Sequence, residues 1–258
     1  MESRYSRLLA SVGFAALLCG SSPAWAQSLG TAASFAVLGG STVTNTGPSI
    51  LTGDLGVSPG SAVTGFPPGL VTGGTIHAAD AVALQAQNDV TTAYNFLAAQ
   101  ACGTDLTGQD LGGLTLTPGV YCFSSSAQLT GTLTLNGPGI YIFQMGTSLT
   151  TASGSAVALT NGASACDVWW QVGSSATLGT TASLPGNILA LTSITLNTGA
   201  SASGRVLARN GAVTLDSNIV TGCAAAPGAA QIPTLSEGGL IMLMALLALV
   251  GVAAMRRH

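Results

Sequence analysis

The chain has 258 residues, of which 47% are hydrophobic, 35 are glycine and only 6% are charged. It contains no lysine, and this lack of positive charge argues against nucleic-acid binding, which depends on Lys and Arg contacts to phosphate. Low charge also excludes a disordered chain held open by repulsion. Between Gln27 and Ser236, two arginines and seven aspartates give a formal charge of −5. We therefore expect a surface of Thr, Ser, Ala, Asn and Gly that attracts no polyion strongly.

The first 26 residues have the pattern of a secretory signal peptide. Arg4 and Arg7 precede the apolar run LLASVGFAALL, and the small-residue triplet AWA follows at 24–26. This order of basic, apolar and small residues predicts export, with cleavage after Ala26. Cys19 raises the alternative of a lipoprotein, but Leu18 stands where a lipoprotein signal has a small residue.

The C-terminus carries a second targeting pattern at 232–258, after a Pro/Ala/Gly linker at 225–231. IPTLSE is followed by about 17 apolar residues, just enough to span a bilayer, and by a basic end that would stay cytoplasmic. This tail resembles the IPTL-CTERM sorting signals of Gram-negative bacteria, although Gly238 stands where they usually carry Trp. The resemblance implies recognition by an exosortase-like membrane enzyme, and removal during sorting to the surface. The alternative is a plain C-terminal anchor, the only part of the chain that would enter a membrane.

Four cysteines remain after the signal peptide is removed: Cys102, Cys122, Cys166 and Cys223. An even number in an exported chain predicts two disulfides. The sequence allows three pairings, and nearness along the chain favours Cys102–Cys122, which leaves Cys166–Cys223.

Residues 75–100, TIHAADAVALQAQNDVTTAYNFLAAQ, contain neither Gly nor Pro. They predict one long helix, with Thr75 as its N-cap. Its apolar side recurs at spacings of three and four, which places one stripe along the helix: Ile76, Ala79, Ala83, Gln87, Val90, Tyr94 and Leu97.

A threonine-bearing unit repeats in the second half of the domain. ATLGTTASLPGNILA, ITLNTGASASGRVLA and VTLDSNIVTGC place Thr177, Thr195 and Thr214 at equivalent positions, 18 and 19 residues apart. Each unit contains a Thr-Leu piece, a piece of small residues and a piece that is apolar on both sides. Three short strands in such a period are typical of a β-solenoid. A strand that is apolar on both sides must be covered on both, so we expect the helix to cover the third face and the other two to be exposed.

The sequence shows no catalytic or metal-binding constellation. His77 would lie in the first turn of the helix, and no GxSxG precedes a helix. Asp54, in LTGDLG, is explained by a turn in which it bonds its own backbone. No CxxC occurs and the other histidine is His258, so we expect no metal, no cofactor and no enzymatic activity.

Segments 52–69, 103–123, 139–155 and 168–216, with the helix, resemble microbial ice-binding proteins of the helix-flanked, discontinuous β-solenoid type. The resemblance covers nearly all of the domain at 27–224. It implies a mostly β fold, a three-faced right-handed solenoid with one long helix along one face and with its first and last coils adjacent. It also implies a secreted or surface-bound protein that adsorbs to an ice crystal through a flat face of Thr, Ser and Ala and inhibits ice growth or recrystallisation. We expect a monomer.

The resemblance also suggests which face meets the ice, because the family's ice face is usually the one with small residues. Carried onto this chain, the candidates are Thr46, Ser49, Ser155, Thr181, Ser183, Ser201, Ser203 and Asn218. The alternative is a column of threonines: Thr134, Thr177, Thr195 and Thr214. The alternative function is a cell-surface adhesin or biofilm-matrix scaffold that binds polysaccharide or cells, and an exposed Trp169 or Trp170 would favour it.

Overall fold

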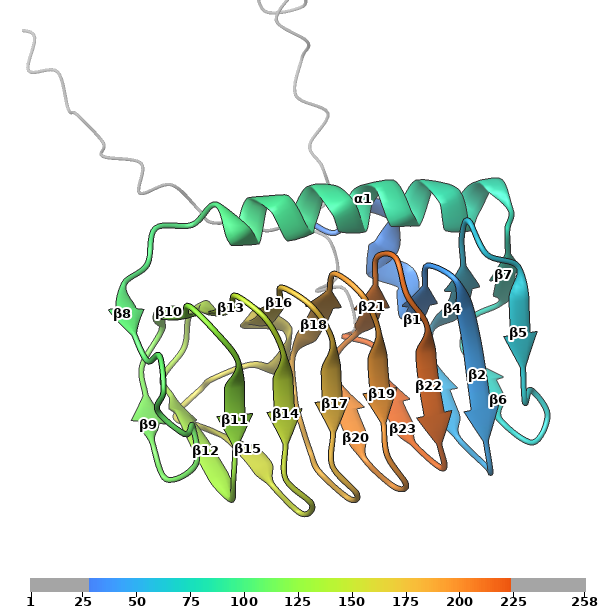
Figure 1. The fold of residues 1–258 in the computed structure, drawn as a ribbon. Coiled ribbons are helices and arrows are strands. Elements are labelled where there is room, and N and C mark those ends of the chain that lie inside the picture. The colour runs from blue at the N-terminus through green and yellow to red at the C-terminus, as the bar shows by residue number, and fades with distance from the viewer. Residues whose placement is uncertain (1–27, 224–258) are drawn as a thin grey trace, which may run out of the picture.

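Residues 28–223 are described by a computed structural model, in which short parallel strands wind into a solenoid beside one long helix (Figure 1). Each regular coil passes through three sheets in the same order, which we name A, B and C. Strands of neighbouring coils pair in parallel, at the usual separation of about 4.8 Å. The signal peptide, the linker and the sorting tail that the sequence predicts lie outside the described residues.

Sheet A has nine strands and lies against the helix. Its members include the segments that the sequence showed to be apolar on both sides. In spatial order they are β7 (Ile76–Ala78), β4 (Asp54–Val57), β1 (Phe35–Gly39), β21 (Val206–Ala208), β18 (Asn187–Ala190), β16 (Val168–Val172), β13 (Tyr141–Met145), β10 (Gly119–Phe123) and β8 (Thr104–Asp105).

Sheet B has seven strands and forms the front of the molecule in Figure 1. In spatial order they are β11 (Ala127–Leu129), β14 (Leu149–Thr151), β17 (Ala176–Leu178), β19 (Ile194–Leu196), β22 (Val213–Asp216), β2 (Thr42–Thr46) and β5 (Ala62–Thr64).

Sheet C is split into a three-stranded and a four-stranded part. Ser183 joins the two parts through isolated bridges to Ala156 and Ser201. The first part contains β15 (Ala156–Thr160), β12 (Thr132–Asn136) and β9 (Thr115–Leu116), and the second β20 (Ser201–Ser203), β23 (Ile219–Thr221), β3 (Ile50–Thr52) and β6 (Leu70–Thr72).

The helix α1 spans Ala81–Ala98, so the predicted start at Thr75 is wrong. Residues 76–78 pair with β4 as the edge strand β7, and His77 therefore lies in a strand. Asp80 is the N-cap and accepts a 2.8 Å hydrogen bond from the backbone N–H of Ala83. That bond and the hydrogen bond with His77 lower the pKa of the Asp80 carboxyl.

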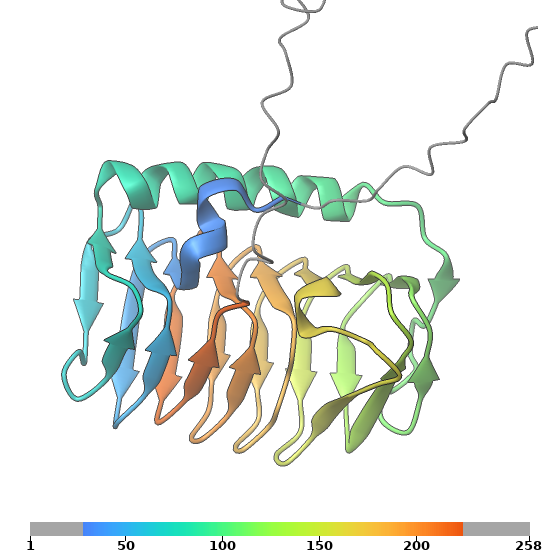
Figure 2. The same ribbon diagram turned by 180° about the vertical axis from the view of Figure 1, so that it is seen from behind.

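The prediction that the helix covers sheet A is confirmed. Trp169, Leu189 and Leu207 are buried beneath the helix, together with its own Val90 and Leu97. The short 3-10 turns are η1 (Gly30–Ser34), which lies between α1 and the strands in Figure 2, and η2 (Ala165–Asp167). The opposite side of sheet A packs into the solenoid core. Each of these strands therefore contacts the helix with one side and the core with the other, which is why both sides are apolar.

The chain builds the stack in two parts that meet in the middle. The first coil, β1–β2–β3, pairs in register with the last coil, β21–β22–β23. Helix α1 then returns along sheet A to the far end, where β8 begins the coils that lead back to the junction (Figure 1). The expected adjacency of the first and last coils is thereby confirmed.

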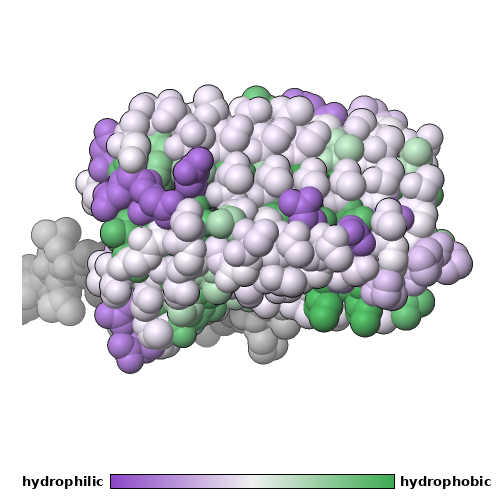
Figure 3. All heavy atoms as spheres, turned by 60° about the horizontal axis from the view of Figure 1, so that its bottom comes forward, coloured by the Kyte–Doolittle hydropathy of each residue, from purple (hydrophilic) through white to green (hydrophobic). Residues whose placement is uncertain are grey.

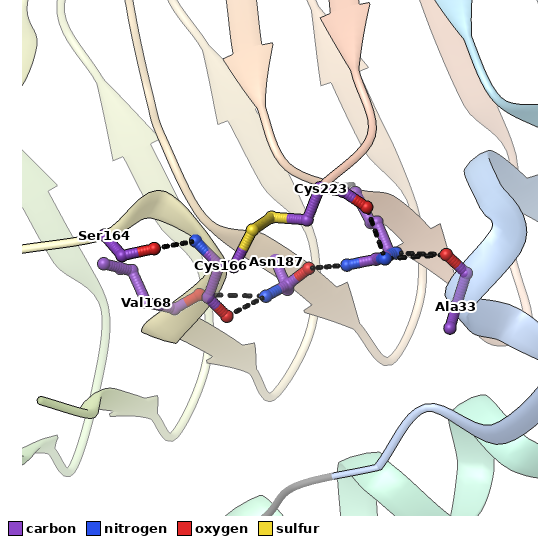
Figure 4. The surroundings of a disulfide bond; sticks show 7 residues. Ala33, Ser164, Cys166, Val168, Asn187 and Cys223 are labelled. Atoms are coloured by element: carbon purple, nitrogen blue, oxygen red, sulfur yellow. Dashed lines mark hydrogen bonds between the residues drawn. A yellow bond between two sulfur atoms is a disulfide. The ribbon is translucent and has the colours of Figure 1, made fainter. Parts of the chain in front are cut away.

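Both disulfides pair as nearness favoured, Cys102 with Cys122 and Cys166 with Cys223. The second one ties the end of β23 to the entry of β16. Beside it lies the buried guanidinium of Arg205, which donates hydrogen bonds to the backbone oxygens of Ala33 and Cys223 and to Oδ1 of Asn187 (Figure 4). One side chain therefore holds the N-terminal turn, the C-terminal coil and the coil between them.

We expect Arg205→Met to lower the free energy of unfolding by about 3 kcal/mol, because it leaves several buried acceptors unpaired at about 1–3 kcal/mol each. Arg209→Met is the matched control. Arg209 is half-buried, its Nε has no hydrogen-bond partner, and its guanidinium carbon lies 4.9 Å from the ring centroid of Tyr94, so its loss should cost about 1 kcal/mol or less. Urea denaturation followed by circular dichroism measures both, and equal losses would contradict the role assigned to Arg205.

Candidate functional site

Two faces of the solenoid are left open by the helix, the outer faces of sheets B and C. Their strands contain one charged residue, Asp216 at the end of β22. Exposed flat sheets usually carry charges that block edge pairing and aggregation. The near absence of charge on these two faces therefore marks them as candidates for contact with something other than bulk water.

A column of threonines crosses sheet B. The register aligns one outward position on all seven strands, and six of the seven residues are threonine. In spatial order they are Gln128, Thr150, Thr177, Thr195, Thr214, Thr44 and Thr64.

A second column of small residues lies two positions earlier on each strand, on the same side of the sheet because side chains alternate. The register follows from backbone hydrogen bonds: the N–H groups of Leu149, Ala176 and Ile194, which come directly after Ser148, Ser175 and Ser193, donate to the carbonyls of Ser175, Ser193 and Ala212. The full set in spatial order is Ser126, Ser148, Ser175, Ser193, Ala212, Thr42 and Ala62. We name these two columns together the Thr/Ser surface.

The Thr/Ser surface has a rigid base. The residue between the two columns points inward on every strand, and Leu149, Ala176, Ile194 and Val213 are each at most 1% exposed. Because β-branched threonines also have few rotamers, the hydroxyls and methyls above this base are held in a regular array. Figure 3 shows the result as a broad, nearly neutral surface with purple patches mainly at its left end.

Three of the small-residue candidates are buried, which corrects the prediction that they face outward. Ser49 and Asn218 are 0% exposed and Ser155 is 1% exposed. Ser49 and Asn218 point inward because the tight turns between sheets B and C leave backbone groups that need partners: the Asn218 amide donates to the carbonyls of Asn197 and Ala200. The hydroxyl of Ser155 donates to the carbonyl of Ala152.

The other candidates are divided between two faces. Ser183, Ser201 and Ser203 point outward on sheet C. Thr181 is exposed in the turn that precedes Ser183, with a positive φ of 57°. Thr46 is exposed at the end of β2 and therefore belongs to sheet B.

Three of the four threonines in the alternative column lie together in the structure. Thr177, Thr195 and Thr214 lie side by side in sheet B. Thr134 lies in β12 of sheet C, opposite Thr115 and Ala158, so its place in this column is wrong.

Sequence reasoning missed half of the threonine column, namely Thr44, Thr64 and Thr150. A signal for them exists in the sequence. A small or hydroxyl residue, an apolar residue and then threonine occur in order at 42–44, 62–64, 148–150, 175–177, 193–195 and 212–214. A search for this triplet, in place of a fixed period, would have found all six, together with 132–134 and 158–160 of sheet C.

Within residues 28–223 we also looked for a metal site, a catalytic carboxylate, a sugar-binding aromatic residue and a membrane-spanning helix. No three His, Cys, Asp or Glu side chains gather as metal ligands would. Asp54 accepts a hydrogen bond from the N–H of Thr75 in the next coil, not from its own turn. Trp169 and Trp170 are 6% and 0% exposed, so neither offers the exposed ring expected of a polysaccharide site. No helix in this range is long and apolar enough to cross a membrane.

Comparisons with known proteins agree with this architecture. The sequence pattern of the ice-binding-like family matches residues 37–221, and that of the IPTL-CTERM motif matches residues 230–257. An ice-binding protein of Nostoc sp. (strain HG1) is 58% identical over 226 residues, which cover 86% of this chain and 83% of that protein. An ice-binding protein of Colwellia sp is 37% identical over 215 residues, covering 76% of this chain and 83% of that protein.

Solved structures are similar over the same region. An ice-binding protein from an Antarctic biological consortium matches with a TM-score of 0.72 and 49% identity, covering 75% of this chain and 90% of that one. An ice-binding protein of the ascomycete Antarctomyces psychrotrophicus matches with a TM-score of 0.72 and 44% identity, covering 75% and 97%. With the family pattern covering most of its length, this chain belongs to the ice-binding-like family.

Proposed function

We propose that this protein adsorbs to ice through the Thr/Ser surface of sheet B and inhibits ice growth or recrystallisation. One observation carries the assignment to this face: the register places six threonines in one line across seven strands. Outward threonine by itself merely suits a β-strand. An uninterrupted line beside a second line of small residues, with no charge in either, is better explained by a flat, repetitive ligand.

The mechanism is adsorption to a solid. Methyl groups and hydroxyls at fixed spacing order the water above them into an ice-like layer that merges with the crystal. Ice between bound molecules must then grow with a curved front, which lowers the local freezing temperature. The face must be rigid beforehand, because ordering flexible side chains on contact would cost entropy at each of them.

We also propose how the protein reaches the outside of the cell. Residues 1–26 serve as the export signal of a Gram-negative bacterium, and 27–224 form the active domain. The tail at 232–258 sorts the protein to the surface, where a membrane enzyme removes it. The IPTL-CTERM match at 230–257 supports surface sorting, and export also suits the two disulfides.

The proposed activity is tested on a single ice crystal grown in the purified, exported protein. We expect faceted crystals and a gap between the melting and the growth temperatures. Round crystals that grow freely in a protein shown to be folded by circular dichroism would contradict ice binding itself.

We expect Thr195→Tyr to abolish most of this activity without unfolding the domain. Thr195 lies mid-column, paired with Thr177 and Thr214, and a ring there would lift several strands off the ice. The affinity for ice should fall about tenfold, as a loss of about 1.4 kcal/mol produces. Thr92→Tyr, on the exposed side of α1, is the matched control and should behave as the unmodified protein. Full activity in Thr195→Tyr would contradict the face assignment.

We expect ice activity to be constant from about pH 5 to pH 9, because threonine and serine hydroxyls do not titrate there. Stability follows a different rule at lower pH. The pKa of Asp80 is lowered in the fold, so its contribution is present above the unfolded pKa of about 3.9 and is lost as the pH falls through the folded pKa. Ice-growth inhibition is measured from about pH 5 to pH 9, and thermal melting from about pH 7 down to about pH 2, where the Asp80 contribution is lost. A step in activity between about pH 5 and pH 9 would contradict a charge-free site.

A further inference from the structure

The four-stranded part of sheet C carries the largest exposed aliphatic side chains of the solenoid's open faces. Ile219, Ile50 and Leu70 are 53%, 41% and 56% exposed. The register places them in one line across β23, β3 and β6, with Ser201 of β20 at its end. Figure 3 shows hydrophobic spheres gathered in a row at the lower right, below the neutral surface.

A second line runs beside the aliphatic one, two residues further along each strand. It consists of hydroxyl residues, Ser203, Thr221, Thr52 and Thr72. The Thr72 hydroxyl donates a 3.0 Å hydrogen bond to the carbonyl of Leu51, and the Thr52 and Thr72 hydroxyls lie 3.3 Å apart. We name these two lines the Ile/Thr surface.

The base of the Ile/Thr surface is as rigid as that of sheet B. Three of the four residues between its two lines, Ala202, Val220 and Leu51, are at most 1% exposed and belong to the solenoid core, and the fourth, Val71, is partly buried against that core. The surface also continues from the Thr/Ser surface, because β2 leads into β3 and β22 into β23 through turns of three and two residues. Buried Ser49 and Asn218 bind to each other inside this corner and fix it.

We propose that the Ile/Thr surface is a second ice-adsorbing face, which contacts a different crystal plane or a growth step beside the plane held by sheet B. This inference rests on the proposed function and extends it. The chemistry is the same as on sheet B: a charge-free, regular array of methyls and hydroxyls on a rigid sheet. An ice crystal offers planes in many orientations, so two faces that meet at a fixed corner can bind where one cannot.

The size of the Ile/Thr surface argues against a protein partner. Its two lines span about 14 Å across the strands and about 7 Å along them. A stable protein interface buries about 800 Å² on each partner, which is far more than these lines offer. The surface also lacks the Trp, Tyr and Arg side chains that dominate binding energy at protein interfaces.

The test uses the exported protein labelled with an amine-reactive dye. The chain contains no lysine, so the dye marks only the N-terminal amine. A single ice crystal is grown in each labelled protein, and the fluorescent planes are recorded. The variants are Ile50→Glu on the Ile/Thr surface, Thr195→Tyr on the Thr/Ser surface, and the double variant. The control is Leu84→Glu, which places the same charge at an aliphatic side chain of α1 that is 54% exposed.

We expect Thr195→Tyr to adsorb to only some of the ice planes that the unmodified protein labels, and to label them more weakly. Ile50→Glu should lose adsorption to those same planes, where its affinity falls about tenfold. The double variant should leave the crystal dark and Leu84→Glu should match the unmodified protein. An unchanged pattern in folded Ile50→Glu would overturn the second face. A dimer in analytical ultracentrifugation that Ile50→Glu dissociates would also overturn it, in favour of a second copy. A dark crystal with the unmodified protein would instead reject the proposed function as a whole.

Discussion

The pairing of the first coil with the last is the contact on which the rest of the structure depends. Without β1–β3 against β21–β23, sheet B would end at β22, and the threonine line would lose Thr44 and Thr64. Sheet C would likewise lose β3 and β6, and with them most of the Ile/Thr surface. Arg205 and the Cys166–Cys223 disulfide stand at this junction and hold three separate segments together. The full width of both open faces therefore depends on one long-range contact.

Much of the fold could be predicted from the residues alone, because the coils that lead up to the junction follow one another in the chain. The regular spacing of Thr177, Thr195 and Thr214 identified these coils. Their strands that are apolar on both sides indicated that a second layer, α1, must cover the outer side of the sheet. The start of the helix could not be found in this way. Residues 76–78 lack Gly and Pro and continue the apolar periodicity, yet β4 offers them an edge to pair with, and tertiary pairing outweighs local propensity.

The site was harder to predict than the fold, for two physical reasons. A fixed period cannot align strands from coils of unequal length, so Thr134 was placed beside residues of another sheet and Thr150 was missed. Nor does composition distinguish an outward serine from an inward one. Ser49 and Asn218 look like members of a small polar face, but their hydrogen-bonding groups satisfy the backbone of the corner turns. Such inward polar residues become visible only when the turns that need them are known.

The meeting of the two chain ends also sets the order in which the domain can fold. Thr44 and Thr214 are neighbours in the sheet although they are 170 residues apart in the chain. The N-terminal coils cannot find their pairing edge until the last coil has been made, and contacts of such sequence separation are slow to form. If the chain is exported as we propose, this slow closure leaves it open while it crosses the membrane. The connectivity is thus compatible with transport as an unfolded polypeptide, and sheets B and C reach their full width only when the two ends of the domain meet.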